Sequence, residues 1–143
     1  MIHAELRVLR VVTKLLLPLI LLFALYVQFH GDFGPGGGFQ AGVIFATGIV
    51  LYALVFGLDA ARRVVPPLIV LRGMPLGVLI YAGTGFATLA LGGGFLDYDR
   101  IHPADPAHGQ HLGILIVELG VGVTVACTMV SLFYAFAGRG ARQ

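Results

Sequence analysis

Residues 39–58 read FQAGVIFATGIVLYALVFGL and contain no charged side chain. A helix needs about 20 predominantly apolar residues to cross the hydrocarbon core of a bilayer. The whole chain has this character, because 58% of its 143 residues are hydrophobic and 11% are charged, against roughly 25% charged in soluble domains. A soluble globule of this composition would lack the polar residues needed to cover its surface. The sequence therefore predicts an integral membrane protein.

Three further apolar runs complete the predicted architecture, an all-α membrane protein with four transmembrane helices. The expected spans lie at about residues 11–29, 39–58, 73–91 and 112–136. Together they form a single membrane domain over residues 1–143. No small-x-small cleavage site follows the first span, so we expect it to be retained rather than removed as a signal peptide. Pro66, Pro67 and the apolar residues after them predict a short interfacial segment before the third span.

The basic residues predict the orientation of these spans. Eight of the nine lie near the start of the first span, between the second and third spans, or after the fourth: Arg7, Arg10, Lys14, Arg62, Arg63, Arg72, Arg139 and Arg142. The other two loops contain the ninth, Arg100, together with the aspartates at 32, 97, 99 and 105. By the positive-inside rule, both termini and the middle loop lie in the cytoplasm.

Small residues recur at helical spacing within the spans. The small-xxx-small pairs are Gly42 with Ala46, Gly73 with Gly77, and Gly122 with Ala126. This spacing lets helix backbones approach closely in a bilayer, where lipid offers no hydrophobic drive for association. The spacing alone leaves two interpretations open. These faces either close the four helices on one another or pack against partner subunits.

Glu118 is the one acidic residue inside a predicted span. A carboxylate within a membrane helix costs on the order of 2.5 to 3.5 kcal/mol on insertion scales unless it is paired, hydrated or protonated. His111 lies seven positions earlier and therefore on nearly the same helical face. Because histidine titrates near neutral pH, the two residues predict an entry relay for protons or cations. The alternative is that Glu118 pairs with a neighbouring helix and fixes assembly.

The most distinctive stretch is residues 30–42, which read HGDFGPGGGFQAG. Its glycines and proline cannot form a stable helix, and they exceed what a plain tight turn needs. We expect a special backbone path, such as a loop that dips between subunits. His30 and Asp32 in this stretch are further candidates for an ion or proton pathway. The glycine spacing matches no nucleotide-binding loop.

Other chemistries find little support. His102, His108 and His111 accompany acidic residues in the last outer loop, but their spacing matches no metal motif. Asp97 and Asp99 lie in what we expect to be a flexible loop rather than a defined cleft. The single cysteine excludes an intrachain disulfide, and the net charge of +2 is too slight to suggest nucleic-acid binding. We expect neither an enzyme nor a cofactor or metal site.

Residues 33–42, FGPGGGFQAG, resemble the MrpB/MnhB family, whose members are small subunits of the multi-subunit Mrp (Mnh) cation:proton antiporters. The likeness extends from about residue 9 to about residue 136 and includes the last helix, HLGILIVELGVGVTV at 111–125. The loop residues that match the family motif are Phe33, Gly34, Pro35, Gly36, Gly37, Gly38, Phe39 and Gln40. The resemblance implies functional importance for Pro35 and Phe39.

The resemblance also implies the setting of the chain. Such complexes exchange cytoplasmic Na⁺ or Li⁺ for external H⁺, driven by the proton motive force, in the cytoplasmic (inner) membrane of a prokaryote. The expected partners are large subunits of the A and D types, small subunits of the C, E, F and G types, and the lipid bilayer. This chain would be an accessory subunit that contributes to assembly and to an ion or proton pathway.

Three alternatives remain. A free-standing four-helix exporter of small cations or drugs would place its essential carboxylate in the first helix, and residues 11–29 contain none. The chain could instead be a purely structural subunit of a related hydrogenase-type membrane complex. A close match to the carboxy-terminal region of A-type subunits also leaves open a detached segment of a larger protein.

Overall fold

The computed structural model describes residues 2–31 and 34–140 of the chain. The elements are α1 (Ile2–His30), α2 (Gly38–Phe56), α3 (Leu58–Val64), α4 (Pro67–Ala90), the short 3-10 helix η1 (Tyr98–Arg100) and α5 (Pro106–Gly140). No β-strand occurs in the described part. Four of the helices, α1, α2, α4 and α5, are long and apolar enough to span a membrane. The predicted all-α class with four transmembrane helices is therefore confirmed.

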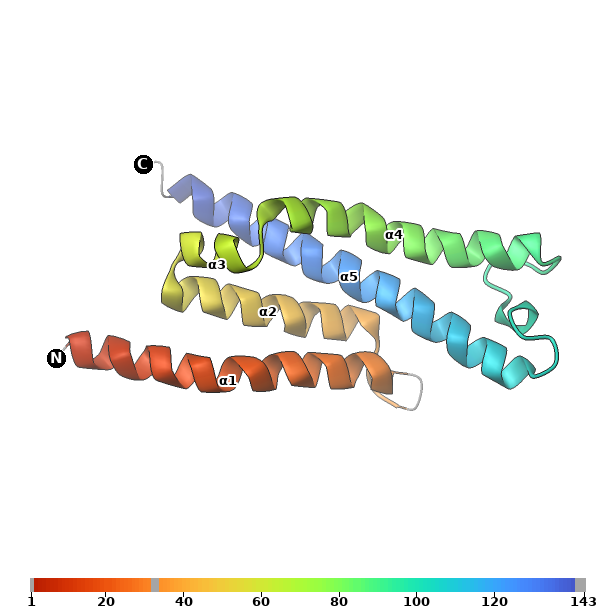
Figure 1. The fold of residues 1–143 in the computed structure, drawn as a ribbon, viewed down its shortest axis with the longest axis horizontal. Helices are drawn as coiled ribbons and strands as arrows, with labels where there is room; N and C mark the ends of the chain where they lie inside the picture. Colours follow the sequence, from red (N-terminus) through yellow and green to blue (C-terminus); the bar gives the residue numbers. More distant parts are fainter. Residues whose placement is uncertain (1, 32–33, 141–143) are drawn as a thin grey trace.

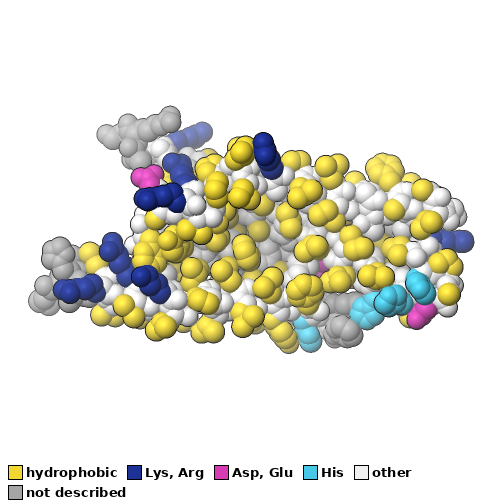
Figure 2. Space-filling model, viewed as in Figure 1, with side chains coloured by type: hydrophobic (Ala, Val, Ile, Leu, Met, Phe, Trp, Pro, Cys, Tyr) yellow, Lys and Arg dark blue, Asp and Glu magenta, His cyan; other side chains and the backbone are white. Residues whose placement is uncertain are grey.

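The four long helices form a row rather than a closed bundle (Figure 1). The main contacts join α1 to α2, α2 to α5, and α5 to α4, so the central member of the fold is α5. The helices run alongside one another, and the start of α1 and the end of α5 lie at the same end of the molecule, on the left in Figure 1. An even number of crossings requires this. Most visible Lys and Arg gather toward that end and the visible His toward the other (Figure 2). That the basic end faces the cytoplasm stays a prediction from the positive-inside rule.

Three of the long helices, α1, α4 and α5, begin well before the expected spans, and in α4 and α5 this changes an interpretation. The helix α4 begins at Pro67. The first helical turn tolerates proline, because its backbone N–H groups have no acceptor within the helix. The apolar residues after Pro67 are therefore part of the third long helix and not a separate interfacial segment. The fourth long helix starts at Pro106, six residues before the expected span. This places His108 and His111 on a helix rather than in a loop.

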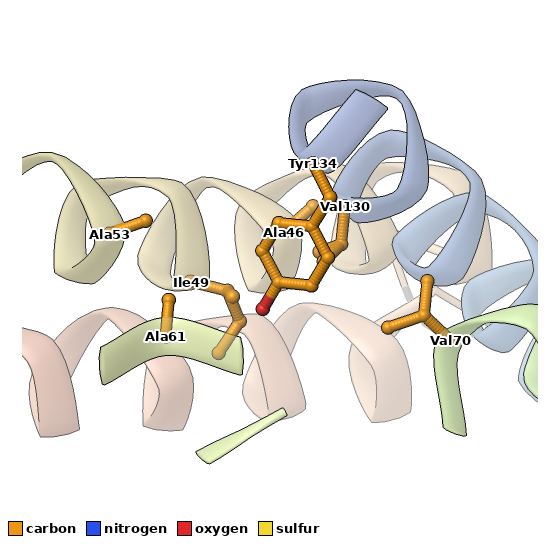
Figure 3. Packing of buried hydrophobic residues seen from close by; sticks show 7 residues of the cluster. All are labelled: Ala46, Ile49, Ala53, Ala61, Val70, Val130 and Tyr134. Atoms are coloured by element: carbon orange, nitrogen blue, oxygen red, sulfur yellow. The ribbon is translucent and has the colours of Figure 1, made fainter. Parts of the chain in front are cut away.

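The end of the molecule that contains α3 is held by an apolar core. Its buried members are Ala46, Ile49, Ala53, Ala61, Val70, Val130 and Tyr134, and Figure 3 shows them converging from α2, α3, α4 and α5. The Tyr134 hydroxyl donates to the carbonyl of Val65 at 3.1 Å. Nη2 of Arg62 donates to the carbonyl of Tyr134 at 3.4 Å. These bonds hold α3 and the turn after it against α5.

The connection between α4 and α5 is folded rather than extended into solvent. Thr88, which is fully buried, donates to the carbonyls of Gly85 and Gly94 at 2.8 and 3.0 Å. Its oxygen also accepts from the N–H of Leu96 at 2.9 Å. Tyr98 packs so closely on α5 that a Cβ at Gly113 would overlap its ring. The expectation of a flexible loop here was wrong, because one buried hydroxyl and one aromatic ring anchor it.

The small-residue pairs lie on contacts inside the chain. A Cβ at Gly42 would stand 2.7 Å from the carbonyl oxygen of Gly122. One at Gly77 would overlap Thr124 of α5, and one at Gly73 would overlap Cys127. Glycine at these positions lets α2 and α4 approach the backbone of α5. The structure therefore supports the interpretation that these faces close the fold on itself.

Candidate functional site

The glycine-rich connection turns back tightly against the end of α1. The N–H of Gly37 donates to the carbonyl of Val27, in the last turn of α1, at 3.1 Å. A Cβ at Gly36 would stand 2.8 Å from that same carbonyl oxygen. Gly37 has a φ of 122°, a value that side chains other than glycine rarely adopt. The path is thus specific to glycine, as the excess of glycine in the sequence suggested. Asp32 and Phe33 lie outside the described residues.

This turn presses directly against Glu118 of α5. A Cβ at Gly38, the first residue of α2, would overlap the backbone carbonyl oxygen of Glu118. A Cβ at Gly31 would stand 2.8 Å from Glu118 Oε2, and one at Gly37 would stand 2.9 Å from Oε1. Both carboxylate oxygens therefore lie against loop glycines, so the motif and the intramembrane acid form one site.

A cavity of about 330 Å³ lies beside this carboxylate. Its lining residues come from α1 and α5: Gln28, Phe29, His108, His111, Leu112, Leu115 and Glu118. Glu118 is partly exposed, and no described residue donates a hydrogen bond to its carboxylate or forms an ion pair with it. A basic partner on a neighbouring helix, the alternative left open by the sequence, is therefore not found within the described part of the chain.

Two of the four candidate pathway residues border this cavity. His111 and Glu118 line it together, as their helical spacing predicts. His30 is not among its lining residues; it stacks on Tyr26 with a ring separation of 5.0 Å and lies beside Gly34. Asp32, the fourth candidate, lies in the part of the loop that the structure does not describe.

The structure adds two residues that sequence reasoning missed. His108 also lines the cavity, one turn before His111 on α5, because the helix begins earlier than the hydropathy indicated. Gln28 borders the cavity from α1 and is 5% exposed. The sequence offered one signal for Gln28, because it is the only residue with an amide side chain in the first expected span.

The described residues on the other side of the motif are exposed, although Gln40 Oε1 lies 3.4 Å from the Cβ position of Gly37, beside the Glu118 carboxylate. Pro35 and Gln40 are exposed, and Phe39 is 61% exposed although it follows the buried Gly38. The motif therefore has an inner side of glycines that contact Glu118 and an outer side that presents Phe39 to its surroundings. Within the described residues, no group of three or more His, Cys, Asp or Glu is placed to hold a metal ion.

Comparison with known proteins identifies the family of the chain. Residues 8–131 match the family described as "Domain related to MnhB subunit of Na+/H+ antiporter". "Putative antiporter subunit mnhB2" of Staphylococcus haemolyticus is 33% identical over 133 residues, which cover 92% of this chain and 94% of the relative. Proteins of the same name in Staphylococcus aureus and Staphylococcus epidermidis are 32% and 30% identical over the same shares. The chain belongs to the MnhB family and is a multi-pass protein of a prokaryotic cell membrane.

Proposed function

We propose that this chain is a membrane subunit of a multi-subunit Na⁺/H⁺ antiporter and that the cavity beside Glu118 forms part of its proton or cation route. Its partners are the large A- and D-type and small C-, E-, F- and G-type subunits, and the antiport is driven by the proton motive force. One observation carries the pathway role. A carboxylate without an ion-pair partner among the described residues lies inside a span, at the wall of a cavity that two histidines also line.

Membrane energetics support this role. An ionisable residue inside a span that lacks a partner is stable where it is protonated or where water or a transported ion reaches it. His108, His111 and Glu118 line one cavity from the same helix and extend about 15 Å along it, at 1.5 Å per residue. The ring nitrogens of the two histidines can donate or accept hydrogen bonds. They therefore provide steps between the outer surface and the carboxylate.

The decisive variant is Glu118→Gln, which keeps the shape of the side chain and removes its charge. We expect the reconstituted complex to assemble fully and to lose Na⁺-driven proton movement in proteoliposomes. The matched control is Asp59→Asn, the same chemical change at an exposed position of α3, far from the cavity. Full assembly with unchanged exchange in Glu118→Gln would refute the pathway role. Loss of exchange together with loss of assembly would assign Glu118 a structural role instead.

A second role, in assembly, is favoured by the outer side of the glycine motif. Phe39 exposes 61% of its surface at the start of α2, where a neighbouring subunit can cover it. We expect Phe39→Ala to lower the yield of complete complex when other subunits are purified with this chain. Phe136→Ala is the control, because Phe136 is 68% exposed near the opposite end of the molecule. Complete assembly of Phe39→Ala at the control level would reject the assembly role.

Expression of this chain alone tests the subunit assignment itself. An accessory subunit leaves vesicles without any measurable cation or dye extrusion. Extrusion by the isolated chain, at a level that Glu118→Gln abolishes, would show a free-standing transporter and overturn the assignment.

A further inference from the structure

Gln28 carries a buried amide that the proposed pathway does not yet use. The residue lies near the end of α1 and is 5% exposed. Its Nε2 is enclosed and has no hydrogen-bond acceptor among the residues that the structure describes. A polar group in a span cannot turn to bulk water for a partner. Nε2 therefore requires an acceptor at this site.

The amide lies close to the stretch of α5 that carries Glu118. A Cβ at Gly122 would stand 2.6 Å from Gln28 Oε1, so the amide rests against the α5 backbone where no side chain intervenes. Gly122 is one turn after Glu118. Gln28 and Glu118 also line the same cavity from α1 and α5. Among the described residues, Gln28 Nε2 thus lacks an acceptor and the Glu118 carboxylate lacks a donor, and the two residues line one cavity; Gln28 also lines the neighbouring apolar pocket with Gly122.

We infer that Gln28 is a positioning residue of the Glu118 site, and that its amide turns Nε2 into the cavity and donates to the Glu118 carboxylate through water held there. The volume of about 330 Å³ greatly exceeds the roughly 10 to 15 Å³ that one water needs. An ionised carboxylate only accepts hydrogen bonds, which makes it the natural end of such a bridge. A neutral amide donates to the carboxylate and leaves its negative charge in place. A lysine or arginine side chain would instead cancel that charge. The effect on transport rests on the proposed function, whereas the hydration of the cavity does not.

The donor is tested with Gln28→Leu and Gln28→Asn in the complete complex. Gln28→Leu removes the amide at similar size, and we expect Na⁺-driven exchange to fall about tenfold, because a hydrogen bond to a charged group is lost. Gln28→Asn keeps an amide that one more water can bridge, and we expect it to recover most of the exchange. Gln110→Leu, the same change at an exposed position of α5, should exchange as the unmodified complex does.

Thermal unfolding separates this role from a merely structural one. Nε2 of Gln28 makes no direct hydrogen bond to a described residue, and leucine suits an apolar span, so Gln28→Leu should melt close to the temperature of the unmodified complex even though the bond through water is lost. Unchanged exchange in Gln28→Leu would overturn the inference. So would a loss of exchange that Gln28→Asn does not recover.

Hydration of the cavity is measured without reference to transport, by following the labelling of this chain within the complex. With its single cysteine, Cys127, replaced by alanine, Gln28→Cys should react with a small, water-soluble thiol reagent. Cys127 itself, which lines the apolar pocket that Gln28 also borders but not the cavity beside Glu118, should not react in the unmodified chain. Absence of labelling at position 28 would show a dry cavity and overturn the inference. If Glu118→Gln retains exchange while position 28 is labelled, the proposed pathway fails but the hydrated cavity stands.

Discussion

The two ends of the α2–α5 contact are built in different ways. At the end where α2 begins, backbone meets backbone, because Gly38 touches the carbonyl of Glu118 and Gly42 approaches that of Gly122. At the other end, the contact consists of side chains around Tyr134 (Figure 3). The first arrangement leaves no atom that can move aside, whereas the second resembles an ordinary packed core.

This difference indicates a division of tasks between the two ends. Lipid is as apolar as a helix surface, so helices in a bilayer associate through close packing rather than through a hydrophobic drive. The Tyr134 cluster supplies such packing with large and small side chains. The glycine end adds a polar requirement, since the turn must reach the Glu118 carboxylate while keeping its own backbone hydrogen bonds. The following substitutions test this division, from the largest expected effect to the smallest.

Gly38→Ala should have the largest effect. The new methyl group would overlap the backbone oxygen of Glu118, so α2 and α5 must separate where α2 begins. We expect little or no complete complex to be recovered by co-purification. Gly83→Ala is the matched control, because nothing lies within 4 Å of its Cβ position. It should be neutral or stabilising by up to about 1 kcal/mol. Equal recovery of the two variants would show that the close contact is dispensable.

Tyr134→Ala should destabilise the other end strongly. The side chain is 5% exposed within the cluster, and truncating a buried aromatic residue costs about 3 to 5 kcal/mol. The free energy of unfolding in detergent measures this loss. Leu132→Ala, at a residue 50% exposed on the same helix, should lose far less. If both variants lose the same stability, the cluster does not act as a core.

Thr88→Val extends the comparison to the connection between α4 and α5. The substitution keeps the shape of the side chain but leaves the Leu96 N–H without its acceptor, at a cost of about 1 to 3 kcal/mol. We expect faster amide hydrogen exchange in residues 93–97. Thr47→Val is the control, because that hydroxyl only donates to the carbonyl of Val43 within its own helix. Unchanged amide hydrogen exchange in Thr88→Val would mean that other contacts hold the connection between α4 and α5.

Tyr134→Phe should have the smallest effect. It removes only the 3.1 Å hydrogen bond to the Val65 carbonyl and keeps the ring in the cluster. The expected loss is about 1 kcal/mol, visible as a small decrease in melting temperature. Tyr26→Phe, at an exposed position of α1, should change nothing. A loss near that of Tyr134→Ala would show that the hydrogen bond, and not the ring, holds α3 in place.

The number of long helices and the chemical identity of the site could be predicted because both depend on local sequence. A bilayer demands runs of apolar residues whose backbone bonds are satisfied within one helix, and such runs are visible without a structure. A carboxylate inside such a run is equally visible. Helix ends were less predictable, since hydropathy does not detect a helical turn made of polar residues. The first turn of α5, which contains His108, is of this kind.

The sequence by itself determined that this is a membrane protein with four spans, one intramembrane acid and one glycine-rich turn. Only the tertiary structure decided that the turn and the acid are a single site, because their contact joins residues about 80 positions apart. It likewise placed Gln28 at the same cavity and folded α3 back against Tyr134. Such contacts depend on how helices pack in three dimensions, and the composition of any one helix does not encode them.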